Sequence, residues 1–176
     1  MVSRAFRAGP CLPLVLGLAA CGGASSAELA RCPRAGVLSD ASSVTAFADP
    51  AGAGDVRFRG EITNVVLACD PGKREVDSEL TLTFRGELGP AAQARTETTA
   101  YFVAVVDSAG TVLAKDIFPV QMTFPEGQRV IAFEDRIDRV RIPVAAGMSG
   151  AAYEIIVGFD LTPAEVDYNR ARRGAR

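Results

Sequence analysis

Histidine and tryptophan are both absent from the 176-residue sequence. Without histidine, the chain lacks the commonest general base, the Ser-His and Cys-His nucleophile systems and the commonest metal ligand. Lysine is scarce, since only Lys73 and Lys115 occur, and neither lies in a Ser-x-x-Lys motif. Glycine patterns that cradle phosphate groups are also missing. We therefore expect no catalytic residue, no cofactor and no metal site.

Carboxylates are the remaining catalytic option, and they are densest between Glu134 and Asp138. One interpretation of this cluster is a calcium site or a carboxylate pair for glycoside hydrolysis. The ligand spacing of a calcium-binding loop is absent, so we favour a solvated loop with ion pairs to Arg136 and Arg139. A carboxylate-dependent hydrolase is the weakest of three functional hypotheses.

The amino end has the organisation of an export signal. A positive region with Arg4 and Arg7 precedes an uncharged apolar stretch at residues 11–18, which is followed by small residues. This order indicates a secretory signal peptide. The apolar core has about 10 residues, whereas a membrane-spanning helix needs roughly 20. We therefore expect residues 1–20 to be removed during export.

The junction Leu18-Ala19-Ala20-Cys21 resembles the lipobox of bacterial lipoproteins. In that family a diacylglycerol is attached to the cysteine and the chain is cleaved just before it. The resemblance implies that Cys21 is lipidated and that a lipid anchor holds the chain on a membrane, with each buried methylene contributing about 0.8 kcal/mol. Because Gly22 follows in place of Asp, it also implies the outer membrane, facing the periplasm. An ordinary signal peptide that happens to end near a cysteine is the alternative.

Cleavage before Cys21 leaves 156 residues (176 − 20), which suffice for one domain with its own core. The leader contains two of the 19 basic residues and none of the 21 acidic ones, so the mature net charge is 17 − 21 = −4. This mildly acidic balance gives no electrostatic support for a nucleic-acid partner.

The predicted leader also indicates a role for each of the four cysteines. Cys11 is discarded with the signal and the resemblance assigns lipid to Cys21, so Cys32 and Cys69 remain in an oxidising compartment. We expect these two to form a disulfide, which would stabilise the fold by roughly 3–4 kcal/mol. A metal pair or a reactive thiol is the alternative, although two cysteines without histidine are poor zinc ligands.

After a tether at residues 21–31, rich in small residues, the pattern predicts a β-domain over residues 32–161. The first ordered stretch is expected from Cys32 to Phe47. The later predicted strands are Val56–Ala68 with a switch in facing, a strand alternating at Leu80, Leu82 and Phe84, Tyr101–Val106, Val112–Phe118, Arg129–Phe133, Val140–Val144 and Tyr153–Phe159. Turns are expected at residues 107–110 and 125–127. Short strands separated by turns favour an antiparallel sandwich.

Three further groups of residues have expected structural roles. The aromatic residues of the predicted strands are expected in the core: Tyr101, Phe102, Phe118, Phe133, Tyr153 and Phe159. Turn or bulge positions are expected at Gly60, Asn64, Gly86 and Gly110. The segment 162–176 is expected to form a short helix, because Thr162 and Glu165 fit a capping box with Pro163 at the first helical position. We interpret its basic tail, from Arg170 onward, as a frayed and solvated helix end; contact with anionic lipid or an acidic partner is the alternative.

From about Val56 to Leu161, the order of strands and turns resembles the immunoglobulin-like or fibronectin-like accessory domains of bacterial envelope proteins. The predicted fold is therefore all-β: an antiparallel immunoglobulin-like sandwich with a short C-terminal helix. The first functional hypothesis is a non-enzymatic, membrane-anchored interaction module with a protein partner in the cell envelope. The second is a periplasmic carrier that holds an apolar ligand or lipid between its sheets.

Overall fold

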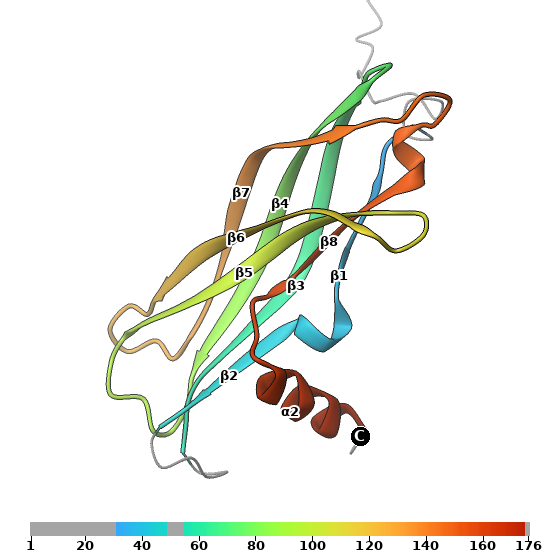
Figure 1. Cartoon of the computed structure of the whole chain (residues 1–176). Helices are drawn as coiled ribbons and strands as arrows, with labels where there is room; N and C mark the ends of the chain where they lie inside the picture. The colour runs from blue at the N-terminus through green and yellow to red at the C-terminus, as the bar shows by residue number, and fades with distance from the viewer. Residues whose placement is uncertain (1–30, 49–54, 175–176) are drawn as a thin grey trace, which may run out of the picture.

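Residues 31–48 and 55–174 are described by a computed structural model, and most of them belong to two four-stranded β-sheets (Figure 1). The strands are β1 (Arg34–Val37), β2 (Ser43–Phe47), β3 (Val56–Pro71), β4 (Glu75–Leu88), β5 (Thr96–Asp107), β6 (Val112–Thr123), β7 (Val130–Pro143) and β8 (Tyr153–Phe159). The helical elements are the 3-10 turns η1 (Ser39–Ala41) and η2 (Gly150–Ala152) and the helix α2 (Pro163–Gly174). The predicted all-β class with a short C-terminal helix is confirmed.

The strands are ordered β1-β8-β5-β6 in one sheet and β2-β3-β4-β7 in the other. Neighbouring strands are antiparallel except β1 and β8, which are parallel. The chain changes sheet between β1 and β2 and again after β4, β6 and β7. Buried side chains from both sheets form one hydrophobic core between them.

The period-two pattern of β4 places its apolar side chains in this core. Leu80, Leu82 and Phe84 are fully buried, whereas Thr81 and Thr83 between them lie on the outer face of the sheet. Burying each such apolar side chain contributes about 1.5–3 kcal/mol to folding. The alternation predicted for this strand is confirmed.

The aromatic residues expected in the core contribute to it unequally. Tyr101, Tyr153 and Phe159 are buried, whereas Phe102, Phe118 and Phe133 are half-buried. The rings of Phe118 and Phe133 stack on the buried rings of Tyr101 and Phe84, respectively.

The predicted change of facing in β3 is also present. Val56, Phe58 and Ile62 point into the core, and the pairing with β4 then shifts between Ile62 and Asn64. This irregularity is a bulge at Thr63, one residue before the position expected at Asn64, which itself pairs with Thr83. Beyond it the strand continues to Pro71.

The prediction of two separate strands at 129–133 and 140–144 is wrong, because β7 is continuous from Val130 to Pro143. The acidic segment Glu134–Asp138 is therefore part of a strand, and its interpretation as a loop is also wrong. The strand persists because β4 pairs with it along nearly its whole length. Ile131, Phe133 and Ile137 keep the inward alternation through the polar segment.

Gly60 and Gly86 are not turn residues; they lie within β3 and β4 and are paired with each other across the two strands. A Cβ atom on Gly86 would lie 2.9 Å from the sulfur of Met122, and one on Gly60 would lie 3.2 Å from the ring of Phe159. These glycines therefore permit a close approach of the opposite sheet. Gly110, in contrast, occupies the predicted turn with φ +80°.

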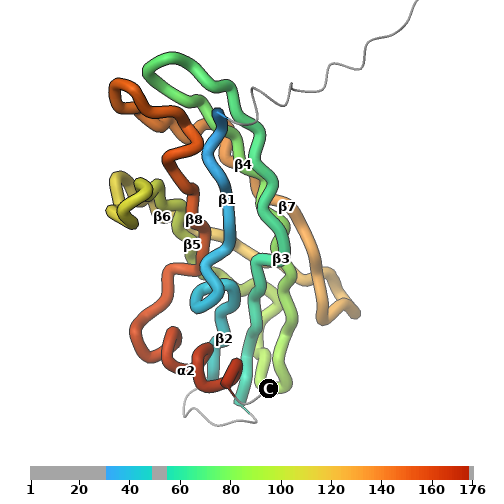
Figure 2. Tube along the Cα trace, turned by 90° about the vertical axis from the view of Figure 1, so that its right-hand side faces the viewer, coloured from blue at the N-terminus to red at the C-terminus, as the bar shows by residue number. Residues whose placement is uncertain are grey.

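The predicted disulfide between Cys32 and Cys69 is present, with their Cα atoms 6.0 Å apart. It joins the start of the described chain to the far end of β3, next to the β3–β4 turn. The β7–β8 loop lies at the same end, whereas α2 lies at the opposite end (Figure 2). We call the region of Cys32, Cys69, residues 72–74 and residues 144–149 the disulfide end.

Candidate binding cleft beside helix α2

Helix α2 begins with the predicted capping box. The backbone amide of Thr162 donates to Glu165 Oε2 at 2.8 Å, and the amide of Glu165 donates to Thr162 Oγ1 at 3.4 Å. These two bonds satisfy amides that would otherwise lack partners at the helix start. The capping box therefore fixes where the chain leaves β8 and turns into α2.

One buried amide attaches the helix to the rest of the domain. Asn169 is 6% exposed, and its Nδ2 donates to the carbonyl oxygens of Asp40 at 3.0 Å and Ser43 at 2.7 Å. The ring of Tyr168 packs edge-on against Phe47 at 5.2 Å between centroids. These contacts place α2 over η1 and the outer face of β2.

Arg170 and Arg173 of the basic tail contact Asp40, so the expected fraying is wrong for the described residues, which are helical to Gly174, although both arginines remain exposed to solvent. The guanidinium of Arg173 is hydrogen-bonded to Asp40 Oδ1, and Arg170 Nε lies 2.7 Å from Asp40 Oδ2. These hydrogen bonds, with Arg173 contributing most, lower the pKa of Asp40 below its ordinary value. The same carboxylate raises the pKa of Arg170. The helix is regular to Gly174.

A cavity of about 370 Å³ lies between this helix and the outer face of the β2–β3–β4 sheet. We call it the α2 cleft. Its walls are formed by Ser39, Ser42, Ser43, Val44, Thr45, Arg59, Gly60, Glu61, Arg85, Glu87, Asn169, Arg172 and Arg173. The floor consists of outward-facing β3 and β4 side chains, and α2 forms one side.

Cations outnumber anions in the α2 cleft, since its lining contains four arginines and two glutamates. Arg85 pairs with Glu87 at 3.1 Å, and Arg173 is bound to Asp40. Arg59 and Arg172 form no ion pair with another described residue. Two guanidinium groups are therefore available to an anion, and guanidinium is suited to bidentate contact with carboxylate or phosphate.

The surroundings of Arg172 hold it beside the cleft. Its guanidinium lies 5.6 Å from the ring centre of Tyr168, and Nη1 is 3.5 Å from the hydroxyl of the buried Thr45. The aromatic ring and the hydroxyl restrict the guanidinium without neutralising its charge. Hydroxyl groups of the neighbouring serines add hydrogen-bonding capacity to the same wall.

A second cavity, of about 440 Å³, lies where the edge strands β6 and β7 meet. It is lined by Gln121, Thr123, Pro125, Gln128, Val130, Ile131, Ala132 and Phe133. None of these side chains is charged, so this cavity offers no counterpart to the arginines of the α2 cleft.

The acidic segment of β7 does not converge on one site. Asp135 faces inward and accepts a 2.8 Å hydrogen bond from the Tyr101 hydroxyl, and burial together with this bond raises the pKa of Tyr101. Arg136 pairs with Glu79 and Asp138, while Arg139 pairs with Asp77. The pair between Arg136 and Asp138 confirms one of the expected ion pairs within the segment, whereas the expected pair of Arg139 within it is wrong, because Arg139 pairs with Asp77 on β4.

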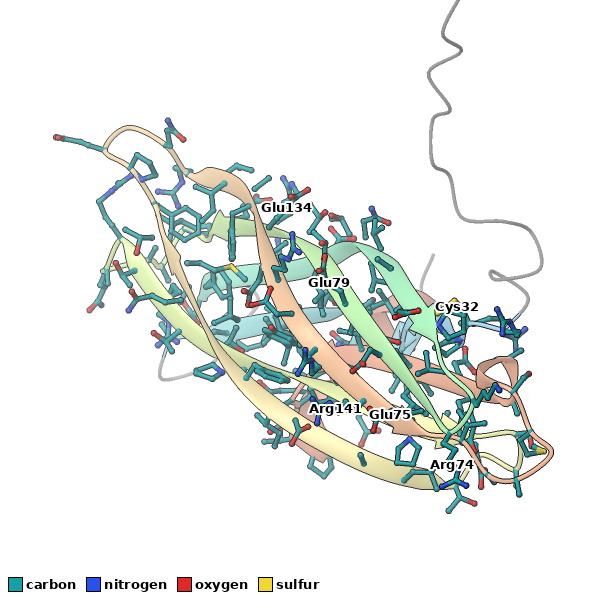
Figure 3. All side chains as sticks on the ribbon, turned by 90° about the horizontal axis from the view of Figure 1, so that it is seen from above. Cys32, Arg74, Glu75, Glu79, Glu134 and Arg141 are labelled. Atoms are coloured by element: carbon teal, nitrogen blue, oxygen red, sulfur yellow. A yellow bond between two sulfur atoms is a disulfide. The ribbon has the colours of Figure 1, made fainter. Side chains whose placement is uncertain are left out.

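A further pair of charged side chains joins β4 and β7 across the outer face. Figure 3 shows Glu75 and Arg141 side by side, with the Arg141 Nε 3.9 Å from a Glu75 carboxylate oxygen. Within residues 31–48 and 55–174, no group of three or more Cys, Asp or Glu side chains is placed to hold a metal ion.

The described cysteines and the two lysines do not line the α2 cleft. Cys32 and Cys69 form the disulfide, and Lys115 pairs with Asp160 at 3.1 Å. Cys21, the predicted signal and nearly all of the tether lie outside the described residues. In the part of the chain that the structure describes, no helix has the length and apolarity needed to cross a bilayer.

Sequence reasoning missed the α2 cleft because its lining comes from four segments: residues 39–45, 59–61, 85–87 and 169–173. Each segment alone has the composition of an ordinary surface. The basic tail was the one feature of the sequence that pointed to this region. Its contact with Asp40 could not be predicted from neighbouring residues, because the two segments are far apart in the sequence. Comparison of the chain with protein-family models, curated proteins and solved structures finds no match.

Proposed function

We propose that this protein is a non-enzymatic lipoprotein of the bacterial envelope that binds an acidic segment of a protein partner in the α2 cleft. The export signal and the lipobox-like junction at Cys21 support lipid anchorage. The same resemblance supports the periplasmic face of the outer membrane as its location. The absence of histidine from the sequence supports a role in binding.

The separation of the disulfide from the α2 cleft is the observation that carries this proposal. Gly60 lines the cleft and Cys69 forms the disulfide, and both belong to the same strand, β3. The nine residue steps of extended chain from Gly60 to Cys69 correspond to about 30 Å. A chain anchored near Cys32 would therefore hold the cleft well away from the lipid surface, where a partner can reach it.

Charge and shape favour an acidic protein segment as the occupant. Arg59 and Arg172 supply guanidinium groups without ion-pair partners among the described residues, and the adjacent wall supplies hydroxyls. A carboxylate side chain can accept two parallel hydrogen bonds from one guanidinium. The volume of about 370 Å³ suits a few side chains and not a folded domain.

An apolar ligand between the sheets has less support. The core contains fully buried Phe84, Leu80 and Ile155, and a Cβ atom on Gly60 or Gly86 would already crowd side chains of the opposite sheet. These contacts leave no room for a ligand at the centre of the sandwich. We therefore place the binding function on the outer surface.

Site-specific photo-crosslinking in the intact envelope tests the proposed function. A photoreactive amino acid replaces Ser39, an exposed cleft residue, and in a matched control it replaces Val66, exposed on the outer face of β3. We expect a discrete protein adduct from position 39 only. Arg59→Glu combined with Arg172→Glu should abolish it, whereas Arg136→Glu combined with Arg139→Glu should not. Equal adducts from both positions, or no adduct from position 39, would contradict the proposal.

We also propose that the sandwich belongs to the immunoglobulin-like architecture. Two four-stranded sheets around one core, with crossings after β4, β6 and β7, support this assignment. An experimental structure with a different strand order in either sheet would overturn it.

A further inference from the structure

The disulfide end has a fixed structure in which three chain segments are joined. The Cys32–Cys69 bond connects the start of the described chain to β3. The amide of Val144 donates to the carbonyl oxygen of Arg74 at 2.8 Å, which attaches the β7–β8 loop to the β3–β4 turn. Gly150 packs so closely on Arg31 that a Cβ atom would lie 2.2 Å from the Arg31 carbonyl oxygen. Side chains on these segments therefore present one continuous surface.

Exposed cations gather on this surface. Arg31, Lys73 and Arg74 are exposed and form no ion pair with another described residue. Figure 3 shows Arg74 at the same end of the domain as Cys32. Asp70 is exposed nearby, while Glu75 faces Arg141. The outermost residues of the disulfide end therefore have a positive balance, although the whole sequence has a net charge of −2.

An exposed apolar side chain lies on the β7–β8 loop at the same end of the domain. Met148 is 49% exposed. It follows Gly147 in the β7–β8 loop, where the chain turns with a φ of +80°. The amide of Met148 donates to the carbonyl oxygen of Ala145 at 3.0 Å, which closes the turn. Residues 144–149 contain no charged side chain. An exposed methionine on an uncharged loop that is hydrogen-bonded to the turn containing Lys73 and Arg74 is suited to a lipid–water interface.

The position of Cys21 in the chain brings this surface to the membrane. Nine residues lie between Cys21 and Arg31, and the ten residue steps from one to the other span at most about 35 Å when fully extended. A lipid on Cys21, which is part of the proposed function, would keep the disulfide end within that distance of the bilayer. A surface confined there needs only weak attraction to remain in contact.

We propose that the disulfide end is a lipid-contacting surface that binds anionic phospholipid head groups through Arg31, Lys73 and Arg74, with Met148 inserted at the interface. Each basic residue near an anionic bilayer strengthens binding by about five-fold at moderate ionic strength. The lipid anchor then supplies attachment, and this surface supplies orientation. Contact at the disulfide end points the α2 cleft away from the bilayer.

Vesicle binding by the unlipidated mature chain tests the surface independently of the anchor. The Cys21→Ser chain is sedimented with phosphatidylglycerol-containing vesicles and with pure phosphatidylcholine vesicles. We expect at least about 25-fold stronger partitioning onto the anionic vesicles, weakening as salt is added. Lys73→Ser combined with Arg74→Ser should remove most of this preference, whereas Arg136→Ser combined with Arg139→Ser, an equal change in charge, should retain it. Equal partitioning onto both vesicles, or an equal loss in both variants, would overturn the inference.

Contact mapping with the lipidated protein provides the second measurement. The protein is reconstituted into anionic vesicles that contain a photoactivatable phospholipid, and labelled peptides are identified by mass spectrometry. We expect label on residues 72–74 and 145–149; label concentrated on α2 or β6 would contradict the proposed orientation. Intact mass reports separately whether Cys21 has lipid. An unlipidated protein whose Cys21→Ser chain still prefers anionic vesicles would refute the anchor and retain the surface.

Discussion

Replacing Asn169 by alanine should raise the population of molecules in which helix α2 is undocked, while the sandwich stays folded. The Asn169 amide is 6% exposed and donates to two backbone carbonyl oxygens, those of Asp40 and Ser43. Its removal leaves both carbonyls without that partner, and an unsatisfied buried group costs about 1–3 kcal/mol. Because water in the adjoining cleft can compensate in part, we expect a total loss of about 2 kcal/mol. This corresponds to a roughly 30-fold increase in the undocked population.

Hydrogen exchange measures this population directly. An isolated helix of this length is marginal in water, so undocking exposes its amides to exchange. We expect exchange in α2 to accelerate about 30-fold in Asn169→Ala, with little change in the central strands β4 and β5. The matched control is Asn64→Ala, at an exposed position next to the bulge of β3. If α2 exchange changes by less than about three-fold, the assigned role of the Asn169 amide is wrong.

Three further predictions concern packing, the disulfide and pH. Gly86→Val should lower the free energy of unfolding by about 1–3 kcal/mol, because its Cβ would lie 2.9 Å from the Met122 sulfur; Gly36→Val, where the nearest atom beyond the chain neighbours would be 3.9 Å from the Cβ, is the control in urea unfolding. Cys32→Ser combined with Cys69→Ser should cost about 4 kcal/mol, given their separation of 37 residues, as measured by the same unfolding assay. The lowered pKa of Asp40 contributes stability above the unfolded-state pKa, and this is lost as pH falls through the folded-state value. Exchange in α2, corrected for its intrinsic pH dependence, should therefore accelerate below about pH 4, and Asp40→Asn should weaken that response.

Each of these predictions has an outcome that would count against it. Equal destabilisation by the two glycine substitutions would mean that the approach of the opposite sheet is not the cause. An unchanged urea midpoint in the double serine variant would mean that the Cys32–Cys69 disulfide does not stabilise the fold. An identical pH response in wild type and Asp40→Asn would show that another group governs α2 docking in acid.

The parts of the fold that sequence predicts well are those specified by neighbouring residues. Alternation at Leu80, Leu82 and Phe84 indicates a half-buried strand because side chains in a strand alternate between faces. The capping box at Thr162 is likewise a local hydrogen-bonding pattern. The disulfide was predicted on the expectation that Cys11 is removed with the signal and that, as the lipobox resemblance implies, Cys21 takes lipid, which leaves Cys32 and Cys69 to pair.

The errors arose where distant contacts override local composition. Glu134 and Asp138 suggest a loop, yet pairing with β4 keeps them in a strand. Gly60 and Gly86 suggest turns, yet they lie within strands, because side chains of the opposite sheet occupy the positions that a larger side chain would take. The α2 cleft is a property of the assembled domain, since Asp40 and Arg173, whose ion pair closes one side, are more than a hundred residues apart.

Intact mass of the protein extracted from its own membrane, with and without reductant, is the most direct test of the central claim. The account predicts a chain that begins at Cys21, has the added mass of acyl groups and gains the mass of two hydrogens on reduction of the Cys32–Cys69 bond. A chain that retains residues 1–20, or one that begins at residue 21 without acyl mass, would contradict it.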